Sequence, residues 1–126
     1  MNEKNSTCPF CNLEREIIVE NDLAIGFYDQ YPVTEGHCLV IPKRHAEDFS
    51  ELTFQEYHSL FDLVMTTIDY LKDHHSQDGF NIGANLGKAA GQTIKHIHIH
   101  VIPREIGDVE DPTGGIRGVI PSKRKY

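Results

Sequence analysis

The sequence has little positive charge. Its 126 residues hold 12 Lys and Arg against 19 Asp and Glu, which gives a formal net charge of -7. A chain this acidic lacks the positive field that holds nucleic acid non-specifically, so we expect no nucleic-acid partner. Any phosphate-binding site must draw its attraction from local histidines and backbone N–H groups, because the overall charge works against it.

Long apolar runs are also missing. No stretch approaches the roughly 20 residues of a membrane-spanning helix, and residues 1–7 lack the apolar core of a secretory signal. Three cysteines, two of them close together, are too few and odd in number for a disulfide framework, and they favour a reducing compartment. We therefore expect a cytoplasmic protein with no membrane partner and a mobile tail over residues 1–7.

The remaining composition is that of one globular domain. Hydrophobic residues make up 39% of the chain and charged residues 25%, and we find no internal repeat or linker. We expect a single domain over residues 1–126. Residues 105–126 are rich in Gly, Pro and Asp and are expected to form an extended C-terminal segment, docked through Ile116, Val119 and Ile120.

The pattern of apolar residues predicts an α+β fold. Turn signals separate short strands at residues 17–19, 23–28, 37–42 and 79–86, and the first two form a hairpin. Thr53 and Glu56 have the spacing of a capping box, and a helix follows to about Asp73. Its apolar stripe is interpreted as core: Phe54, Tyr57, Phe61, Val64, Ile68 and Leu71. We expect an antiparallel sheet of about five strands, one long helix and a short helix near the N-terminus.

The fifth strand carries three histidines. Residues 94–102 alternate with period two, which points Ile97, Ile99 and Val101 into the core and His96, His98 and His100 to the opposite face. Same-face neighbours on a strand lie about 6.5–7 Å apart. A solvated strand face is the structural alternative and would suffice for a single histidine. Three in a row, flanked by Gly-Gln-Thr and Pro-Arg, favour a functional site, since Val or Thr would pack better.

Other residues with chemical potential lie outside this strand. Cys8 and Cys11 form a CxxC pair, which needs two further ligands to hold a metal, and the βαβ context of a redox pair is not evident. His37 and His45 stand at the two ends of the third strand. Asp29 ends the second strand, where it either contacts a ligand or forms a turn by bonding its own backbone.

These motifs together resemble the histidine triad (HIT) family. Residues 96–102 match its signature, His-φ-His-φ-His-φ-φ with φ apolar, and residues 36–45 and 27–29 resemble two further strands of the family. Residues 90–93 and 103–108 look most like the fragile-histidine-triad branch of dinucleoside polyphosphate hydrolases. Two departures stand out: Asn85 replaces the Gln of that branch, as in the phosphoramidase-like branch, and the Cys pair with His45 is found in a bacterial-type subset.

The resemblance implies a HIT-like fold and a nucleotidyl hydrolase that releases AMP from diadenosine tri- or tetraphosphate through a nucleotidyl-histidine. His98 would be the nucleophile, with His100 and His37 against the phosphate oxygens and His96 in support. Asp29 would bind ribose, Asn85 the phosphate or leaving group, and Gly91, Gln92 and Thr93 would line the pocket. The family also implies a homodimer formed through the helix and a sheet edge.

The resemblance further implies a structural zinc held by Cys8, Cys11, His45 and His96. Four protein ligands leave no open position, so no catalytic metal is expected. The alternative is that both cysteines are free thiols.

Other functions stay open at this point. An adenosine phosphoramidase or a nucleotide phosphorylase of the same family fits the residues equally well. A metal-dependent hydrolase could use the His-x-His pattern as ligands, although no carboxylate interrupts the triad. A non-catalytic nucleotide-binding module would keep the pocket without turnover, and an intact His98 argues against it.

Overall fold

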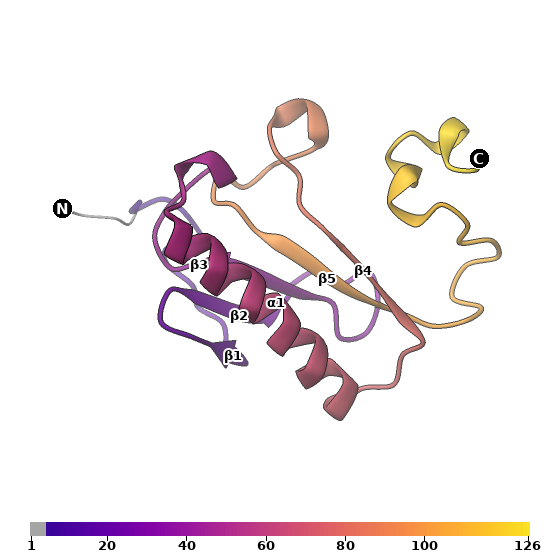
Figure 1. The fold of residues 1–126 in the computed structure, drawn as a ribbon, viewed down its shortest axis with the longest axis horizontal. Coiled ribbons are helices and arrows are strands. Elements are labelled where there is room, and N and C mark those ends of the chain that lie inside the picture. The colour runs from indigo at the N-terminus through magenta and orange to yellow at the C-terminus, as the bar shows by residue number, and fades with distance from the viewer. Residues whose placement is uncertain (1–4) are drawn as a thin grey trace.

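A computed structural model describes residues 5–126. It contains strands β1 (Val19–Glu20), β2 (Ala24–Tyr28), β3 (Cys38–Pro42), β4 (Gly79–Gly83) and β5 (Ile99–Arg104), and helix α1 (Phe54–His74). The strands form one antiparallel sheet in the order β1-β2-β3-β5-β4, and α1 crosses one face of it (Figure 1). The expected α+β fold is confirmed. No helix in residues 5–126 is long and apolar enough to cross a membrane.

Strand alternation divides the apolar residues between the two faces of the sheet. One set packs with the buried side of α1 and includes Val40, Ile99 and Val101. The other face carries a second cluster of Ile25, Phe27, Leu39 and Ile41, against which Phe10 and Leu13 of the N-terminal segment pack. The N-terminal segment and α1 therefore cover opposite faces of the same sheet.

Helix α1 begins where the sequence indicates but presents a different face. Thr53 caps it, and the reciprocal bonds of a capping box with Glu56 are both present. Phe54 and Phe61, which we expected in the core, are 78% and 48% exposed. The buried apolar side chains are Leu60, Leu63, Val64 and Leu71. The two phenylalanines contact neighbours at the surface instead, Phe54 stacking on His58 and Phe61 meeting Phe49.

The ends of the chain differ from expectation. The short N-terminal helix is absent from the described residues, and residues 9–12 form turns in which the Asn12 N–H donates to the Cys8 carbonyl. Of the tail expected over residues 1–7, the first four lie outside the described residues, and Thr7 N–H donates to the Asn5 side chain.

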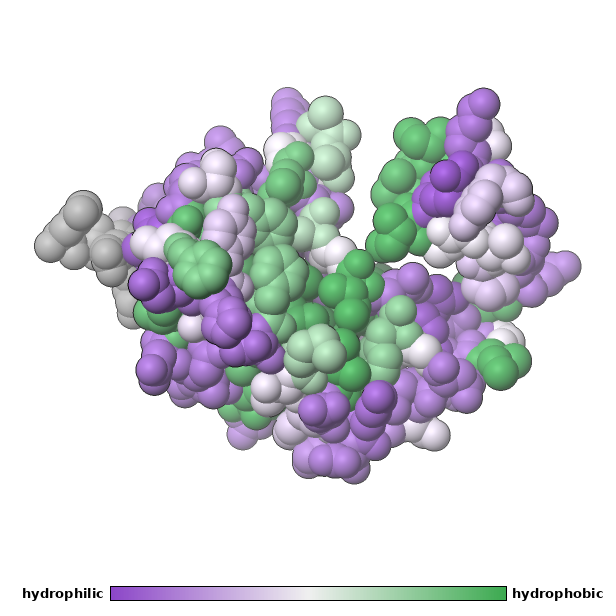
Figure 2. All heavy atoms as spheres, in the orientation of Figure 1, coloured by the Kyte–Doolittle hydropathy of each residue, from purple (hydrophilic) through white to green (hydrophobic). Residues whose placement is uncertain are grey.

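The C-terminal segment contains two short 3-10 helices, Gly115–Val119 and Pro121–Lys123. Ile116 approaches the β4 edge near Gly83, but it is 57% exposed. Val119 and Ile120, also expected to dock, are exposed too. Figure 2 shows apolar atoms on the side of this segment that faces the body across an open gap.

Two strands are shorter than the sequence pattern. β4 ends at Gly83, and β5 begins at Ile99 rather than at Ile94, so His96 and His98 precede the strand. The backbone before β5 bonds to the loop that follows β3, where Ile97 N–H donates to the Ala46 carbonyl at 2.7 Å. Pro42, the last residue of β3, has no N–H to donate to the ladder. Its carbonyl accepts a hydrogen bond from the ring of His96 instead.

A buried ion pair joins the loop after β3 to the start of α1. Glu56 is 6% exposed, and its two oxygens accept from the Arg44 guanidinium at 2.7 and 2.8 Å. The same carboxylate accepts the Thr53 N–H of the capping box. These bonds, Arg44 foremost, hold the pKa of Glu56 below its usual range despite burial.

We predict that Glu56→Ala lowers the free energy of unfolding by about 2–4 kcal/mol, because it removes the cap and strips Arg44 of its carboxylate. Glu56→Gln retains the capping bond, so its cost is smaller, about 1–2 kcal/mol. Urea denaturation measures both values. The exposed Glu105→Ala is the control, and a Glu56→Ala variant as stable as that control would contradict the prediction.

Candidate functional site

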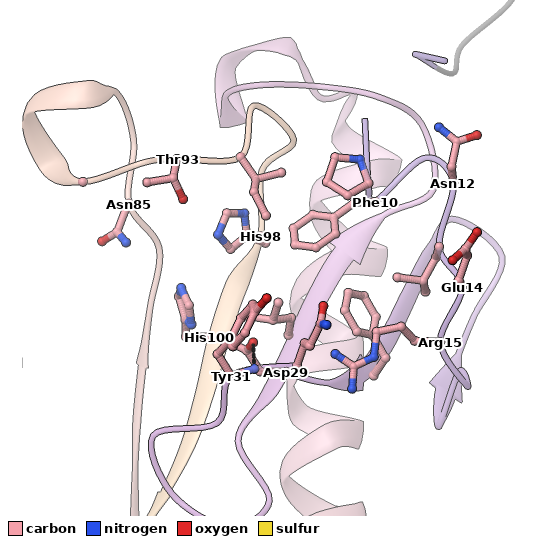
Figure 3. A pocket seen from close by; sticks show the side chains of 17 residues that line it. Phe10, Asn12, Glu14, Arg15, Asp29, Tyr31, Asn85, Thr93, His98 and His100 are labelled. Atoms are coloured by element: carbon pink, nitrogen blue, oxygen red, sulfur yellow. Dashed lines mark hydrogen bonds between the residues drawn. The ribbon is translucent and has the colours of Figure 1, made fainter. Parts of the chain in front are cut away.

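A cavity of about 570 Å³ opens on the sheet face opposite α1. This is within the size range of small-molecule sites, about 300–1,000 Å³. Its walls come from three parts of the chain, namely residues 9–15, the β2–β3 region and the segment from Asn85 to His100. His100 reaches this face because it pairs with Leu39 across the β3–β5 ladder. Figure 3 shows His98 and His100 at one end and Asn12, Glu14 and Arg15 at the other.

Backbone contacts fix the tautomer of His98. Its Nδ1 lies 2.8 Å from the carbonyl oxygen of His96, which can only accept, so Nδ1 carries the proton. In the neutral ring the Nε2 lone pair is then free, and the ring lies in the cavity wall (Figure 3). The side chain is 7% exposed and Phe10 meets it edge-on, with ring centroids 5.2 Å apart. These contacts leave one nitrogen available as a nucleophile.

A second histidine pair lies beside it. The Val33 N–H donates to His37 Nδ1, so the His37 proton is on Nε2, 2.9 Å from His100 Nδ1. His100 therefore accepts at Nδ1 and keeps its own proton on Nε2, as a donor for a ligand. Gly36 allows the tight turn that places His37, with φ +91°, a conformation that favours glycine.

Both members of this pair are held neutral. Burial lowers the pKa of His37, and the Asp29 carboxylate offsets part of that effect. Burial also lowers the pKa of His100 to about 4, with repulsion from His98 and His37 as further causes. Neutral rings near pH 7 match the tautomers that their hydrogen bonds require.

Asp29 forms the turn that was one of its two expected interpretations, and it also lines the cavity. One oxygen accepts the Tyr31 N–H at 2.9 Å, a turn made with its own backbone and drawn as the dashed line in Figure 3. The other oxygen lies 3.4 Å from His37 Nε2, and the residue lines the cavity. A turn-forming carboxylate can thus also face a ligand.

The structure places most of the remaining candidates at the cavity and two of them elsewhere. Asn85, Gly91 and Thr93 line it. Gln92 bonds to the backbone instead. Its side chain accepts from Gly87 N–H and donates to the carbonyls of Glu47 and Ile94. His37, which we expected against the phosphate oxygens, is 3% exposed and stands behind His100 outside the cavity lining, with its Nε2 2.9 Å from His100 Nδ1.

The four metal-site candidates converge next to the cavity. Cys8, Cys11, His45 and His96 place their ligand atoms within 4.8 Å of one another. His96 Nε2 lies 2.8 Å from the Pro42 carbonyl, so it donates there and leaves Nδ1 bare towards the sulfurs.

The spacing of these four atoms fits a tetrahedral metal. Sulfur-to-Nδ1 distances are 3.4 Å for Cys8 to His96, 3.5 Å for Cys11 to His96 and 3.2 Å for Cys11 to His45. Zinc with ordinary bond lengths separates a sulfur ligand from a nitrogen ligand by about 3.6 Å. Both the geometry and the Cys2His2 chemistry therefore suit a closed site.

Sequence patterns missed the apolar wall of the cavity. Phe27 and Leu39 come from neighbouring strands, and Phe10 and Leu13 come from the N-terminal segment. Phe27 could have been found by its alternation with Asp29, which directly follows β2. Phe10 lies between the two cysteines and gives no periodic signal, and neither does Tyr31 in its loop.

Comparisons with known proteins identify the family of this chain. The family model described as HIT domain matches residues 12–107. An uncharacterized HIT-like protein of Mycoplasma genitalium is 39% identical over 109 residues, covering 81% of this chain and 77% of the relative. A Dictyostelium discoideum protein named Bis(5'-adenosyl)-triphosphatase is 34% identical, with 82% and 69% covered. A Mycobacterium tuberculosis protein named AP-4-A phosphorylase is 34% identical, with 83% and 55% covered.

Solved structures share the fold. A Streptococcus mutans protein superposes with a TM-score of 0.79 at 32% identity, covering 88% of this chain and 74% of that protein. A Zn-bound histidine triad family protein from Mycobacterium smegmatis superposes with a TM-score of 0.75 at 35% identity, covering 83% and 80%. The domain match spans the histidine motif, the helix and all five strands, so this chain belongs to the HIT family.

Proposed function

We propose that this protein is a nucleotidyl hydrolase that cleaves dinucleoside polyphosphates at the α-phosphate through a nucleotidyl-His98 intermediate. The observation that carries the proposal is the bond from His98 Nδ1 to the His96 carbonyl, which leaves Nε2 unprotonated in the cavity. A neutral imidazole with one nitrogen held and the other free is a competent nucleophile.

In the first step Nε2 attacks the α-phosphorus and the bond to the bridging oxygen breaks. The bonding electrons leave with the remaining phosphate chain, and His98 becomes an N-phosphorylated imidazolium that keeps its Nδ1 proton. The His96 carbonyl lies against that N–H, where it stabilises the positive charge. In the second step water displaces His98, loses a proton and releases AMP, and the neutral ring is restored.

The neighbouring groups suit the phosphate. His37 donates to Nδ1 of His100, so the Nε2–H of His100 is available as a donor. A phosphate oxygen is a suitable acceptor for this N–H. Thr93 and Asn85 line the same end of the cavity (Figure 3). Neutral donors supply the attraction that a chain of net charge -7 does not provide at long range.

The rest of the cavity suits a nucleoside. Phe10, Leu13, Phe27 and Leu39 make an apolar wall next to the histidines, which can take a base. Asp29 lies between that wall and the histidine end and has an oxygen to accept a ribose hydroxyl. The names of the two relatives, a Bis(5'-adenosyl)-triphosphatase and an AP-4-A phosphorylase, support an adenine dinucleotide as substrate.

The same intermediate serves a second candidate, a phosphorylase. If inorganic phosphate displaces His98 in place of water, the product is ADP and not AMP. Turnover of diadenosine tetraphosphate with and without phosphate, analysed by chromatography, distinguishes the two reactions. ADP formed in proportion to added phosphate would replace the hydrolase proposal by the phosphorylase.

We predict that His98→Ala lowers kcat for diadenosine tri- or tetraphosphate by at least about 10³-fold, because no other group can form the intermediate. Mass spectrometry of the wild type quenched in turnover should find AMP on His98. The exposed His58→Ala is the matched control and should retain activity. Unchanged turnover in His98→Ala would reject the nucleophile.

We also propose that Cys8, Cys11, His45 and His96 hold a structural zinc, supported by the fit of their ligand atoms and by the Zn-bound relative. When bound, zinc would join the N-terminal segment to the segment before β5, and its binding would stabilise the fold.

Elemental analysis should give about one zinc per chain. The Cys8→Ser/Cys11→Ser variant should lose it and unfold at lower temperature, whereas Cys38→Ala should keep it because this buried cysteine lies outside the cluster. Zinc retained in the double variant would contradict this assignment.

The neutral His100 has a consequence for stability. Its pKa is 6.5 in an unfolded chain and about 4 here, so between these values the unfolded chain binds more protons. The free energy of unfolding should therefore fall as the pH drops from 6.5 to about 4. We predict that His100→Asn reduces this slope in urea titrations, whereas His58→Asn leaves it unchanged. Equal slopes in His100→Asn and wild type would contradict the neutral assignment.

A further inference from the structure

The segment that carries the two cysteines also builds one wall of the cavity. Six lining residues come from it: Pro9, Phe10, Asn12, Leu13, Glu14 and Arg15. The two residues between the cysteines, Pro9 and Phe10, are among them. The proposed metal site and the proposed nucleotide site thus share a stretch of chain.

This segment is held to the body by few kinds of contact. Its recorded backbone hydrogen bonds close turns within residues 5–12, and Ile18 N–H to the Gly26 carbonyl begins the pairing with β2. Between these points the described contacts with the body include the sulfur contacts to His45 and His96 and the apolar packing of Phe10 and Leu13. A metal bound by both cysteines would add strong bonds to these contacts.

Phe10 lies at the point where the two sites meet. Its ring contacts His96 of the metal cluster at 5.9 Å between centroids and His98 of the cavity at 5.2 Å, both edge-to-face. It also meets Phe27 of the apolar wall at 5.6 Å. In Figure 3 the Phe10 ring lies directly beside His98, between the histidine end and the outer wall. Any shift of the cysteine loop moves this ring against the base pocket.

Resting on the proposed function, we propose that metal occupancy of the Cys8/Cys11/His45/His96 cluster controls nucleotide affinity, with Phe10 as the positioning residue that transmits it. With the metal bound, the loop would be fixed and Phe10 would close the base pocket. Without the metal, the loop would be released and the pocket would lose its wall. By reciprocity, a bound nucleotide must raise the affinity for zinc by the same factor.

The test measures this linkage with AMP as the nucleotide. Zinc affinity is determined by competition with a chromophoric chelator, with and without saturating AMP. We expect AMP to raise the zinc affinity of the wild type by about 5- to 150-fold, the range of one base–aromatic contact. In Phe10→Ala, which keeps all four ligands, AMP should leave the zinc affinity unchanged.

Two variants serve as controls. Tyr31→Ala removes another aromatic ring from the cavity wall, but from the loop after β2, so it should weaken AMP binding and retain the linkage. Phe10→Tyr keeps the ring and should retain the linkage too. Because a merely structural phenylalanine would change stability without abolishing the linkage, this pattern identifies coupling.

The outcomes separate the two proposals. If the wild type binds AMP and its zinc affinity does not change, the coupling is wrong and the proposed function stands. If Phe10→Ala keeps the full linkage, Phe10 is not the transmitter and the inference is overturned. A wild type that binds no AMP would reject the proposed function itself, and one that binds no zinc would overturn the coupling alone.

Discussion

Two backbone carbonyls determine what the histidines of this protein can do. The Pro42 carbonyl accepts a hydrogen bond from His96 Nε2–H, and the His96 carbonyl accepts one from His98 Nδ1–H. An imidazole chooses its tautomer by the hydrogen bond that its other nitrogen makes. As a result His96 presents a bare Nδ1 to two cysteines, and His98 presents a bare Nε2 to the cavity. Residues two positions apart thus gain different chemistry from the same side chain.

The two faces of the sheet have different roles, since one packs against α1 and the other forms the cavity. Helix α1 buries the face that carries Val40 and Val101, so the opposite face is available for the cavity. The chain joins the β5 ladder only at Ile99. The residues before it run past the end of β3, which brings His96 to the Pro42 carbonyl. A regular strand over residues 94–102 would have used its backbone groups in the ladder and could not have bonded the Ala46 carbonyl as Ile97 does.

Much of this could be predicted from local patterns. Alternation placed Ile97, Ile99 and Val101 in the core, and the capping box located the start of α1. Patterns failed where tertiary contacts decide. Phe54 and Phe61 fit a helical stripe, yet the sheet packs against the neighbouring stripe of Leu60, Leu63 and Val64, because a helix rich in apolar residues offers more than one face.

The site shows the same division. Residues with distinctive chemistry, such as His98 and Asp29, could be identified from type and position. The apolar wall could not, because Phe10 and Leu39 look like any core residue until the segments that carry them meet. Gln92 carries a plausible polar side chain, but it bonds to two backbone groups of its own loop and to the Glu47 carbonyl in the segment after β3.

The single N–H of Val33 also bears on ion selectivity. Asp29, His37 and His100 form a second group whose ligand atoms lie within 4.8 Å of one another, as those of the cysteine cluster do. A cation could use His37 Nε2 only if the proton there moved to Nδ1, where it would oppose the Val33 N–H. One main-chain amide thereby keeps the His37 proton on Nε2, so this nitrogen has no lone pair to offer a cation while the hydrogen bond to Val33 persists.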